Sequence, residues 1–438
     1  MARKSAFLGI FLYTVRHNSK GALKMTAVEM LCTNAKKASL FLNTASSEEK
    51  NHALEAIADA LSSRFEEIIE CNRANVEAAR SSGISDSMID RLSLDKKRID
   101  GMANGVREVV KLDDPVGVVL SRSIRPNGLE IIKMSVPMGV IGIIYEARPN
   151  VTSDAAVLCL KAGSAVVLRG GKEALNSNRK IVEIMRSALK NVGFPEDCIC
   201  LIDNTSRESA TELMRMKGKV DLLIPRGGAG LIKSVVENAT VPVIETGTGN
   251  CHVYVDESAD LDMAANIVYN AKTSRVSVCN ACESVLVNKN IAERFLPKMK
   301  TMTDKKNVEL RGCEQTADIL PGIKAASDDD YAREFLDYIL SVKVVSDVDE
   351  AIEHINRYSS GHSECIVTEN EQNAEKFRRL IDSAAVYVNA STRFTDGGEF
   401  GLGAEIGIST QKLHARGPMG LKEMTTYKYI INGNGQVR

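Results

Sequence analysis

The 438-residue chain is long enough for two or three domains, and its 44% of apolar residues can fill a large core. Its 56 Lys and Arg residues balance 57 Asp and Glu residues at a formal net charge of −1, which disfavours both nucleic-acid binding and disorder. The longest apolar run, residues 6–15, is too short to span a bilayer. These properties predict a globular enzyme or binding protein that contacts neither nucleic acid nor membrane.

Residues 1–24 are predicted to be a disordered basic extension. The first 28 residues contain no Asp or Glu but carry five cations: Arg3, Lys4, Arg16, Lys20 and Lys24. Such a composition is also typical of a mitochondrial presequence, although no clear small-residue cleavage site follows. We expect the folded part to begin at Met25 and the protein to be cytoplasmic, with mitochondrial targeting as the alternative.

Ten cysteines are scattered along the chain, without the dense spacing of a disulfide-rich secreted domain. This pattern favours a reducing compartment, in which most of them act as small buried hydrophobes. Cys279 and Cys282 form a C-x-x-C pair, but a structural zinc site needs a second ligand pair at motif spacing. The sequence contains no such pair, so no metal is predicted.

Helical patterns fill the chain from about residue 46 to 112. Ser46 and Glu49 have the spacing of a capping box, and apolar residues then recur every three or four positions. From Ser121 to Pro137 the pattern alternates like two strands around the turn Pro126-Asn127-Gly128, which predicts a β-hairpin.

Short apolar runs then alternate with helical patterns, which is the rhythm of parallel sheets covered on both faces. The runs are 140–145, 165–168, 200–202, 222–224, 243–244, 252–255, 284–287, 342–345, 365–367 and 386–388. We therefore predict an α/β fold with one parallel-sheet domain over residues 25–250 and a second over 251–390. Residues 391–438 form a C-terminal return and a tail strand.

Four glycine clusters begin at or near the ends of predicted strands. They are Arg169-Gly-Gly-Lys172, Arg226-Gly-Gly-Ala-Gly230, Thr246-Gly-Thr-Gly249 and the run 397–403. Ordinary tight turns would explain any one of them. Since ligands of open α/β sheets bind beyond the carboxyl ends of the strands, the four together indicate an anion-binding crevice. The usual dinucleotide and phosphate-loop glycine motifs are absent from the sequence.

Cys279 lies just before an apolar strand, four residues after Arg275. A nearby cation and the N–H groups of a turn can lower a thiol pKa, so Cys279 is a candidate nucleophile. Inert packing is the alternative for this residue, as it is for the other cysteines.

Several longer motifs indicate a family. The runs 137–150 (Pro-Met-Gly-Val-Ile-Gly-Ile-Ile-Tyr-Glu-Ala-Arg-Pro-Asn) and 161–172 resemble the aldehyde dehydrogenase superfamily. Val345, five further residues and the run 351–366 are similar at every defined position to the signature of the γ-glutamyl phosphate reductase family. The runs 244–250 and 414–423 also resemble that family, so the resemblance extends from about Met25 to Arg438.

The resemblance implies a reaction. Members of this family reduce L-glutamyl 5-phosphate with NADPH to the semialdehyde and release phosphate, as part of proline biosynthesis. Cys279 falls at the family's nucleophile, so its thiolate would form a thioester. Asn150 lies where the superfamily carries an asparagine that stabilises the oxyanion, together with the backbone N–H of Cys279. The alternative interpretation is that Asn150 is only a turn residue that follows Pro149.

The same resemblance places NADPH in the first domain, residues 25–250, and the nucleophile in the second. Arg169 and Lys172 are two cations without the close carboxylate that NAD-preferring members carry, which suits the 2′-phosphate of NADP. Gly230 would open the helix that faces the pyrophosphate, and Glu334 would hold the nicotinamide ribose. A solvent-exposed helix charge is the alternative for Glu334.

The substrate carries a phosphate, an α-carboxylate and an α-ammonium group. Arg148, Arg275 and Arg416 lie in motif-dense loops and could bind its anions, and His362 could line the same pocket. Arg393 is a further candidate. Surface positions are the alternative for each arginine.

Partners and competing functions also follow from the resemblance. It suggests that the hairpin, residues 121–137, and the tail form an arm that joins subunits, so we expect at least a homodimer. A glutamate 5-kinase, which makes the labile substrate, is a candidate transient partner. The alternative function is another acyl-phosphate or acyl-CoA reductase of the same superfamily. A non-catalytic scaffold built on this fold is a further possibility, which the presence of Cys279 and Arg169 disfavours.

Overall fold

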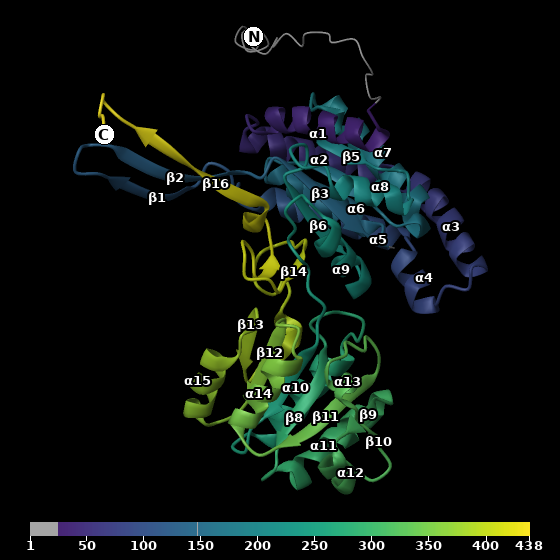
Figure 1. Cartoon of the computed structure of the whole chain (residues 1–438). Helices are drawn as coiled ribbons and strands as arrows, with labels where there is room; N and C mark the ends of the chain where they lie inside the picture. The colour runs from purple at the N-terminus through teal and green to yellow at the C-terminus, as the bar shows by residue number, and fades with distance from the viewer. Residues whose placement is uncertain (1–24, 147) are drawn as a thin grey trace.

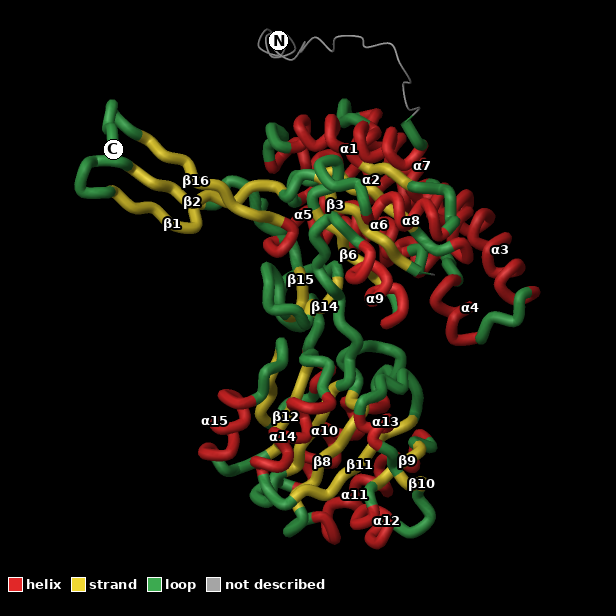
Figure 2. Tube along the Cα trace, in the orientation of Figure 1, coloured by secondary structure: helices red, strands yellow, loops and turns green. Residues whose placement is uncertain are grey.

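The computed structural model describes residues 25–146 and 148–438, so the predicted basic extension lies outside the described residues. Two α/β lobes lie one above the other in Figure 1, and a ribbon of strands projects from the first lobe. Loops and turns connect the lobes (Figure 2). The α/β fold class predicted from the sequence, with two parallel sheets and an arm, is confirmed.

The chain enters the first lobe through a series of helices. They are α1 (Ala27–Leu42), α2 (Ser47–Ser63), α3 (Phe65–Ser81), α4 (Asp86–Leu92) and α5 (Lys96–Lys111). Helix α2 begins with the predicted capping box, in which the Ser46 hydroxyl accepts from the Glu49 N–H and the Glu49 carboxylate accepts from the Ser46 N–H. Its apolar face packs against α5 and α7.

The sheet of the first lobe is parallel, with strand order β5-β4-β3-β6. Its strands are β3 (Val140–Tyr145), β4 (Ala165–Arg169), β5 (Ile199–Leu201) and β6 (Leu222–Arg226). The accompanying helices are α6 (Asn150–Lys161), α7 (Leu175–Asn191), α8 (Arg207–Met214) and α9 (Ala229–Asn238). The run 243–244 forms only an isolated bridge from Val243 to Leu223. Because β4 and β6 flank β3 on opposite sides, the strand order reverses at β3, and a crevice opens there at the carboxyl edge.

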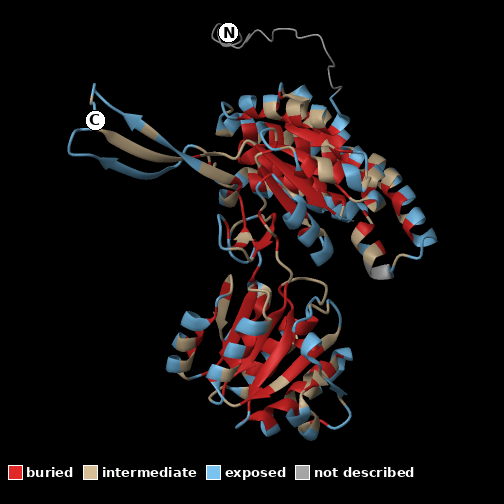
Figure 3. Ribbon diagram, in the orientation of Figure 1, coloured by how far each residue is buried: buried red, intermediate tan, exposed pale blue. Residues whose placement is uncertain are grey.

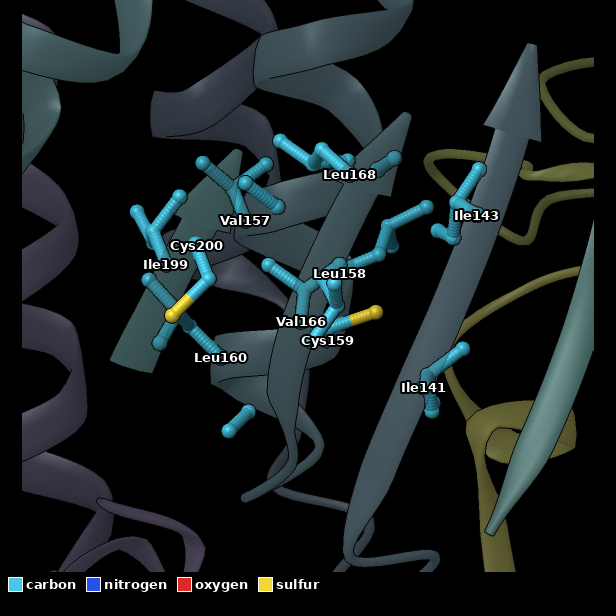
Figure 4. Close-up of a cluster of buried hydrophobic side chains, with 14 of the residues drawn as sticks. Ile141, Ile143, Val157, Leu158, Cys159, Leu160, Val166, Leu168, Ile199 and Cys200 are labelled. Atoms are coloured by element: carbon cyan, nitrogen blue, oxygen red, sulfur yellow. The ribbon is translucent and has the colours of Figure 1, made fainter. Parts of the chain in front are cut away.

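The core of this lobe lies between the sheet and α6. Ile141 and Ile143 of β3, Val166 and Leu168 of β4 and Leu158 of α6 gather there, as Figure 4 shows. All five are almost fully buried. Each such side chain stabilises the fold by about 1.5–3 kcal/mol relative to an exposed position, so the sheet gives the crevice a rigid floor.

The second lobe holds a larger parallel sheet, with strand order β10-β9-β11-β8-β7-β12-β13. Its strands are β7 (Cys251–Val255), β8 (Cys282–Asn288), β9 (Glu309–Gly312), β10 (Lys324–Ala325), β11 (Ile339–Val345), β12 (Ser363–Val367) and β13 (Ala385–Val388). Its helices are α10 (Leu261–Thr273), α11 (Ala292–Thr303), α12 (Glu314–Ile319), α13 (Asp328–Tyr331), α14 (Val348–Tyr358) and α15 (Glu371–Leu380). Every predicted apolar run of this half is a strand, and β9 and β10 are additional.

The projecting arm is an antiparallel sheet of β1 (Val119–Ile124), β2 (Glu130–Pro137) and β16 (Thr425–Asn432). The tail strand β16 pairs with β2 over its whole length, from Thr425 opposite Pro137 to Asn432 opposite Glu130. The hairpin and the tail therefore pair with each other within one chain. Much of the arm is exposed in Figure 3. Its exposed residues include the apolar Ile124 and Ile431.

The chain returns from the second lobe to the arm through a short antiparallel pair, β14 (Gly407–Ser409) and β15 (Gly417–Met419). Within the described residues, no helix is long and apolar enough to cross a membrane.

Candidate active site

A cavity of about 390 Å³ lies between the lobes, where the carboxyl edge of the first sheet faces the amino edge of the second. Tyr145 and Glu146 reach it from the end of β3, and Arg226 reaches it from the end of β6. Cys279 and Asn280 reach it from the loop that precedes β8. The cavity thus opens at the strand-order reversal of the first sheet, where α/β proteins bind their ligands.

Cys279 is half-buried and lines this cavity. The backbone of Gly249 passes so close that a Cβ atom there would lie 1.5 Å from the Cys279 carbonyl oxygen. That oxygen also accepts from the thiol of Cys251, at 3.1 Å. Burial raises the pKa of the Cys279 thiol to about 11, although the nearby Arg226 guanidinium lowers it. The neighbouring residues therefore hold the backbone of Cys279 in place, and the free enzyme keeps its sulfur mainly as a thiol at neutral pH.

Asn150, the predicted oxyanion donor, is the first residue of α6. Its amide nitrogen donates to Asp154 at 3.0 Å. Asn150 lines a second cavity of about 380 Å³, which adjoins the first because Arg91, Arg148 and Arg275 line both. The structure thus places Asn150 beside the Cys279 cavity, with one amide hydrogen already engaged.

Cationic side chains surround the Cys279 cavity. Arg148, Arg226, Arg275 and Arg393 line it, and Arg91 joins them from α4. Burial and the positive charges of Arg91, Arg226 and Arg275 lower the pKa of Arg148 to about 10. Guanidinium groups held this close repel one another, so the cavity favours a ligand with negative charge.

Glu334 also lines the cavity, from the loop after α13, and so it is not a solvent-exposed helix charge. Its carboxylate accepts from the Gly249 N–H at 2.8 Å, and burial raises its pKa. Behind this loop, the fully buried Lys272 and Glu283 form an ion pair at 2.5 Å, and Glu283 accepts from the Leu336 N–H. The loop is therefore anchored at Glu334 itself and, two residues later, at Leu336.

The remaining predicted cofactor residues lie at the end of β4 and the start of α9. The Arg169 guanidinium donates to the carbonyl oxygens of Thr205 and Ser206, at 2.6 and 2.9 Å, while its buried Nε has no partner among the described residues. Lys172 is exposed. Helix α9 begins at Ala229 with Gly228 as its N-cap, so the prediction that Gly230 opens this helix is corrected by one residue.

Two predicted substrate residues lie outside both cavities. His362 is fully buried, with its Nδ1 atom 2.7 Å from the Ser363 hydroxyl. Arg416 forms an ion pair with Asp382, at 3.0 Å, near the surface. Both belong to family motifs, which show that a residue matters but not whether it touches a ligand.

Sequence reasoning missed Arg91, Arg226 and Gly249 as members of the site. Arg226 and Gly249 stand in the quoted glycine clusters, so their place after strands was a usable signal. Arg91 lies in a helical region 188 positions before Cys279, and no local pattern marks it. Within the described residues, no three His, Cys, Asp or Glu side chains are grouped so that they could hold a metal.

Comparisons with known proteins identify the family. The model of the aldehyde dehydrogenase family matches residues 19–333 and 331–430. Among curated proteins, γ-glutamyl phosphate reductase of Clostridium perfringens (strain SM101 / Type A) is 61% identical over 404 residues, or 92% of this chain and 97% of that protein. The same enzyme of Caldanaerobacter subterraneus subsp. tengcongensis is 58% identical over 411 residues, or 94% and 99%.

A solved structure agrees with them. The crystal structure of γ-glutamyl phosphate reductase from Thermotoga maritima has 52% sequence identity and a TM-score of 0.92, and the match covers 94% of this chain and all of that one. The fold, the cavity with its cysteine and these matches point to one conclusion: the chain belongs to the aldehyde dehydrogenase family of oxidoreductases and, within it, to the γ-glutamyl phosphate reductases.

Proposed function

We propose that this protein reduces L-glutamyl 5-phosphate with NADPH to L-glutamate 5-semialdehyde and releases phosphate, in proline biosynthesis. The observation that carries the proposal is the cavity that brings the Cys279 thiol together with Arg148, Arg226 and Arg275. A thiol suits attack on an acyl group, and guanidinium groups suit a substrate with phosphate and carboxylate charges. The name of the relatives supports this substrate.

Cys279 acts as the nucleophile. After the thiol gives its proton to solvent, the sulfur attacks the C5 carbonyl carbon, and a C–S bond forms. The C–O bond to phosphate then breaks, and phosphate leaves with the electron pair. In this proposal the backbone N–H of Cys279 and the second amide hydrogen of Asn150 stabilise the negative charge on the carbonyl oxygen. Arg226 assists because a nearby cation favours the thiolate.

A bound NADPH would supply the hydride that the Cys279 thioester needs to reach the aldehyde level. The C–S bond would then break, with its electron pair returning to the Cys279 thiolate. Four residues would hold the cofactor. Arg169 is the last residue of β4, and Lys172 follows that strand. Gly230 lies in the first turn of α9, and Glu334 lies in the cavity. The unpartnered Nε of Arg169 and the anchored Glu334 carboxylate support the fit of these residues to a phosphorylated dinucleotide.

Lys172 should discriminate between the two nicotinamide cofactors. Replacing it by alanine is expected to raise the KM for NADPH about 10- to 150-fold, because a charge-assisted contact to the 2′-phosphate is lost. The KM for NADH should change little, and steady-state kinetics with both cofactors measure this. Arg169→Ala is the contrasting variant, since it also frees the Thr205 and Ser206 carbonyls and should weaken both cofactors. If Lys172→Ala raises the KM for NADPH and the KM for NADH equally, Lys172 does not bind the 2′-phosphate.

The reaction itself is tested in reverse. The proposal expects L-glutamate 5-semialdehyde to reduce NADP only when inorganic phosphate is present, which absorbance at the NADPH band records. The competing function, an acyl-CoA reductase of the same family, predicts that coenzyme A replaces phosphate as the acceptor. Reduction of NADP with coenzyme A but not with phosphate would favour that alternative.

The arm supports a homo-oligomer. Its edge strands β1 and β16 expose apolar side chains, and exposed strand edges pair readily with another chain. Deleting residues 425–438 is therefore expected to convert an oligomer, at least a dimer, into monomers, as light scattering would show. An unchanged oligomer would contradict this role of the tail.

The ten free cysteines support a reducing, cytoplasmic location. A glutamate 5-kinase remains the candidate transient partner.

A further inference from the structure

The second cavity, of about 380 Å³, lies beside the active site and has a lining of its own. Helices α4 and α5 and the segment between them form one wall, and the first turn of α6 forms another. Arg91, Arg148 and Arg275 line both cavities. A ligand whose reacting carbon lies at Cys279 could therefore extend past these arginines into the second cavity.

Within the part of the chain that the structure describes, the three shared arginines have no acidic partner. Within the described residues, no carboxylate lies at ion-pair distance from Arg91, Arg148 or Arg275. Arg91 donates instead to the carbonyl oxygen of Ser277, at 3.2 Å, in the loop that carries Cys279. Arg91 and Arg148 are half-buried, whereas Arg275 is exposed. A half-buried guanidinium group without a counter-charge is costly, so Arg91 and Arg148 prepare this wall for an anion from the ligand, and Arg275 adds its charge at the rim.

The second cavity also holds a carboxylate that forms no ion pair with a described residue, although the charge of Arg226 acts on it from a distance. Its Asp90 is already paired with Arg98, at 2.6 Å. Asp154, by contrast, accepts only from the Asn150 amide and the Ser153 hydroxyl, and no cation of the described residues lies at ion-pair distance from it. Burial raises the pKa of Asp154 to about 6, so the group is ionised at neutral pH.

We propose that the second cavity binds the amino-acid end of the substrate: Asp154 accepts from the α-ammonium group, and Arg91, Arg148 and Arg275 bind the α-carboxylate. This inference rests on the proposed function. An unpaired carboxylate and unpaired guanidinium groups in one cavity complement a zwitterion, whereas Asp154 would repel a phosphate group. Two methylene groups separate the reacting carbon of the substrate from its α-carbon, so its two ends fit two adjoining cavities.

Recognition of the α-ammonium group is tested with three five-carbon aldehydes in the reverse reaction. L-Glutamate 5-semialdehyde carries both charged groups, glutarate semialdehyde lacks the ammonium group, and pentanal lacks both. For Asp154→Asn, whose amide oxygen can still accept from Asn150, kcat/KM for glutamate semialdehyde should fall about 10- to 150-fold, mainly through KM. The value for glutarate semialdehyde should change little. Asp90→Asn is the matched control, and it should not change the ratio of kcat/KM for glutamate semialdehyde to kcat/KM for glutarate semialdehyde.

A second variant tests the carboxylate. Arg91→Met should lower kcat/KM for both semialdehydes that carry a carboxylate and spare pentanal, because only the anion contact is lost. Equal losses with all three aldehydes would show that Arg91 only supports the Cys279 loop, and this would overturn its role. If Asp154→Asn lowers kcat/KM equally for glutamate semialdehyde and for glutarate semialdehyde, Asp154 does not bind the α-ammonium group.

The wild-type enzyme separates this inference from the proposed function. A phosphate-dependent enzyme that oxidises glutamate and glutarate semialdehydes equally well would leave the proposed reaction intact and refute the subsite. A wild-type enzyme that reduces NADP with none of the aldehydes would overturn the proposed function, and the subsite with it.

Discussion

Cys279→Ser is expected to lower the rate of semialdehyde formation by at least about a thousandfold, while the protein stays folded and still binds NADPH. A serine hydroxyl is a far weaker nucleophile than a thiolate at neutral pH, and among the described residues that line the cavity there is no second cysteine. Steady-state rates measure the loss, and fluorescence of bound NADPH measures the retained affinity. Cys71→Ser, at a half-buried cysteine of α3, is the control and should keep full activity.

The pH dependence of alkylation at Cys279 checks the raised pKa of its thiol independently of the activity measurements. With a thiol pKa of about 11, the thiolate fraction rises with pH throughout the neutral and mildly alkaline range. Alkylation of Cys279 by iodoacetamide should therefore accelerate about tenfold per pH unit from pH 7 to about 10, without the plateau that an ordinary thiol, of pKa about 8.5, reaches. Mass spectrometry of the Cys279 peptide separates this thiol from the others. A plateau near pH 8 would contradict the raised pKa of this thiol, whereas substantial activity of Cys279→Ser would count against Cys279 as the nucleophile.

Gly249→Ala should be almost as damaging, although Gly249 carries no reacting group. The added methyl carbon would lie 1.5 Å from the carbonyl oxygen and 2.2 Å from the carbonyl carbon of Cys279, so the nucleophile loop must move. Displacing a reacting group by about 1 Å can cost about 100-fold in rate, and we expect a fall in kcat of at least that size. The same shift would disturb the bond from the Gly249 N–H to Glu334.

The matched control is Gly105→Ala in α5, where an added Cβ would meet nothing within 4 Å. That change should leave kcat intact and stabilise the helix slightly, by about 0.5–1 kcal/mol. Thermal unfolding of both variants tells a local displacement from a general loss of structure. If Gly249→Ala keeps wild-type kcat, the close approach of the two backbone segments does not control the position of Cys279.

The parallel sheets could be predicted from the sequence because their signal is local. Apolar runs such as 140–145 and 284–287 are buried on both faces, and the structure makes both of them strands. The capping box at Ser46 is likewise local, since its two partners lie three residues apart. Helix α9 shows the limit of such reasoning, because its first residue, Ala229, differs by one position from the predicted start. Short-range patterns identify elements better than they locate element ends.

By itself, the sequence determined the fold class, the family and the candidate nucleophile Cys279, because each depends on residues close together in the chain. Only the tertiary structure decided which charged side chains meet in the cavity around Cys279. Arg91, Arg148 and Arg226 come from α4, the loop after β3 and the end of β6, which the packing of the first lobe brings together, and Arg275 joins them from the second lobe. The same holds for Asp154 in the second cavity and for the pairing of β2 with β16. Such contacts depend on strand order and lobe packing, which local periodicity does not encode.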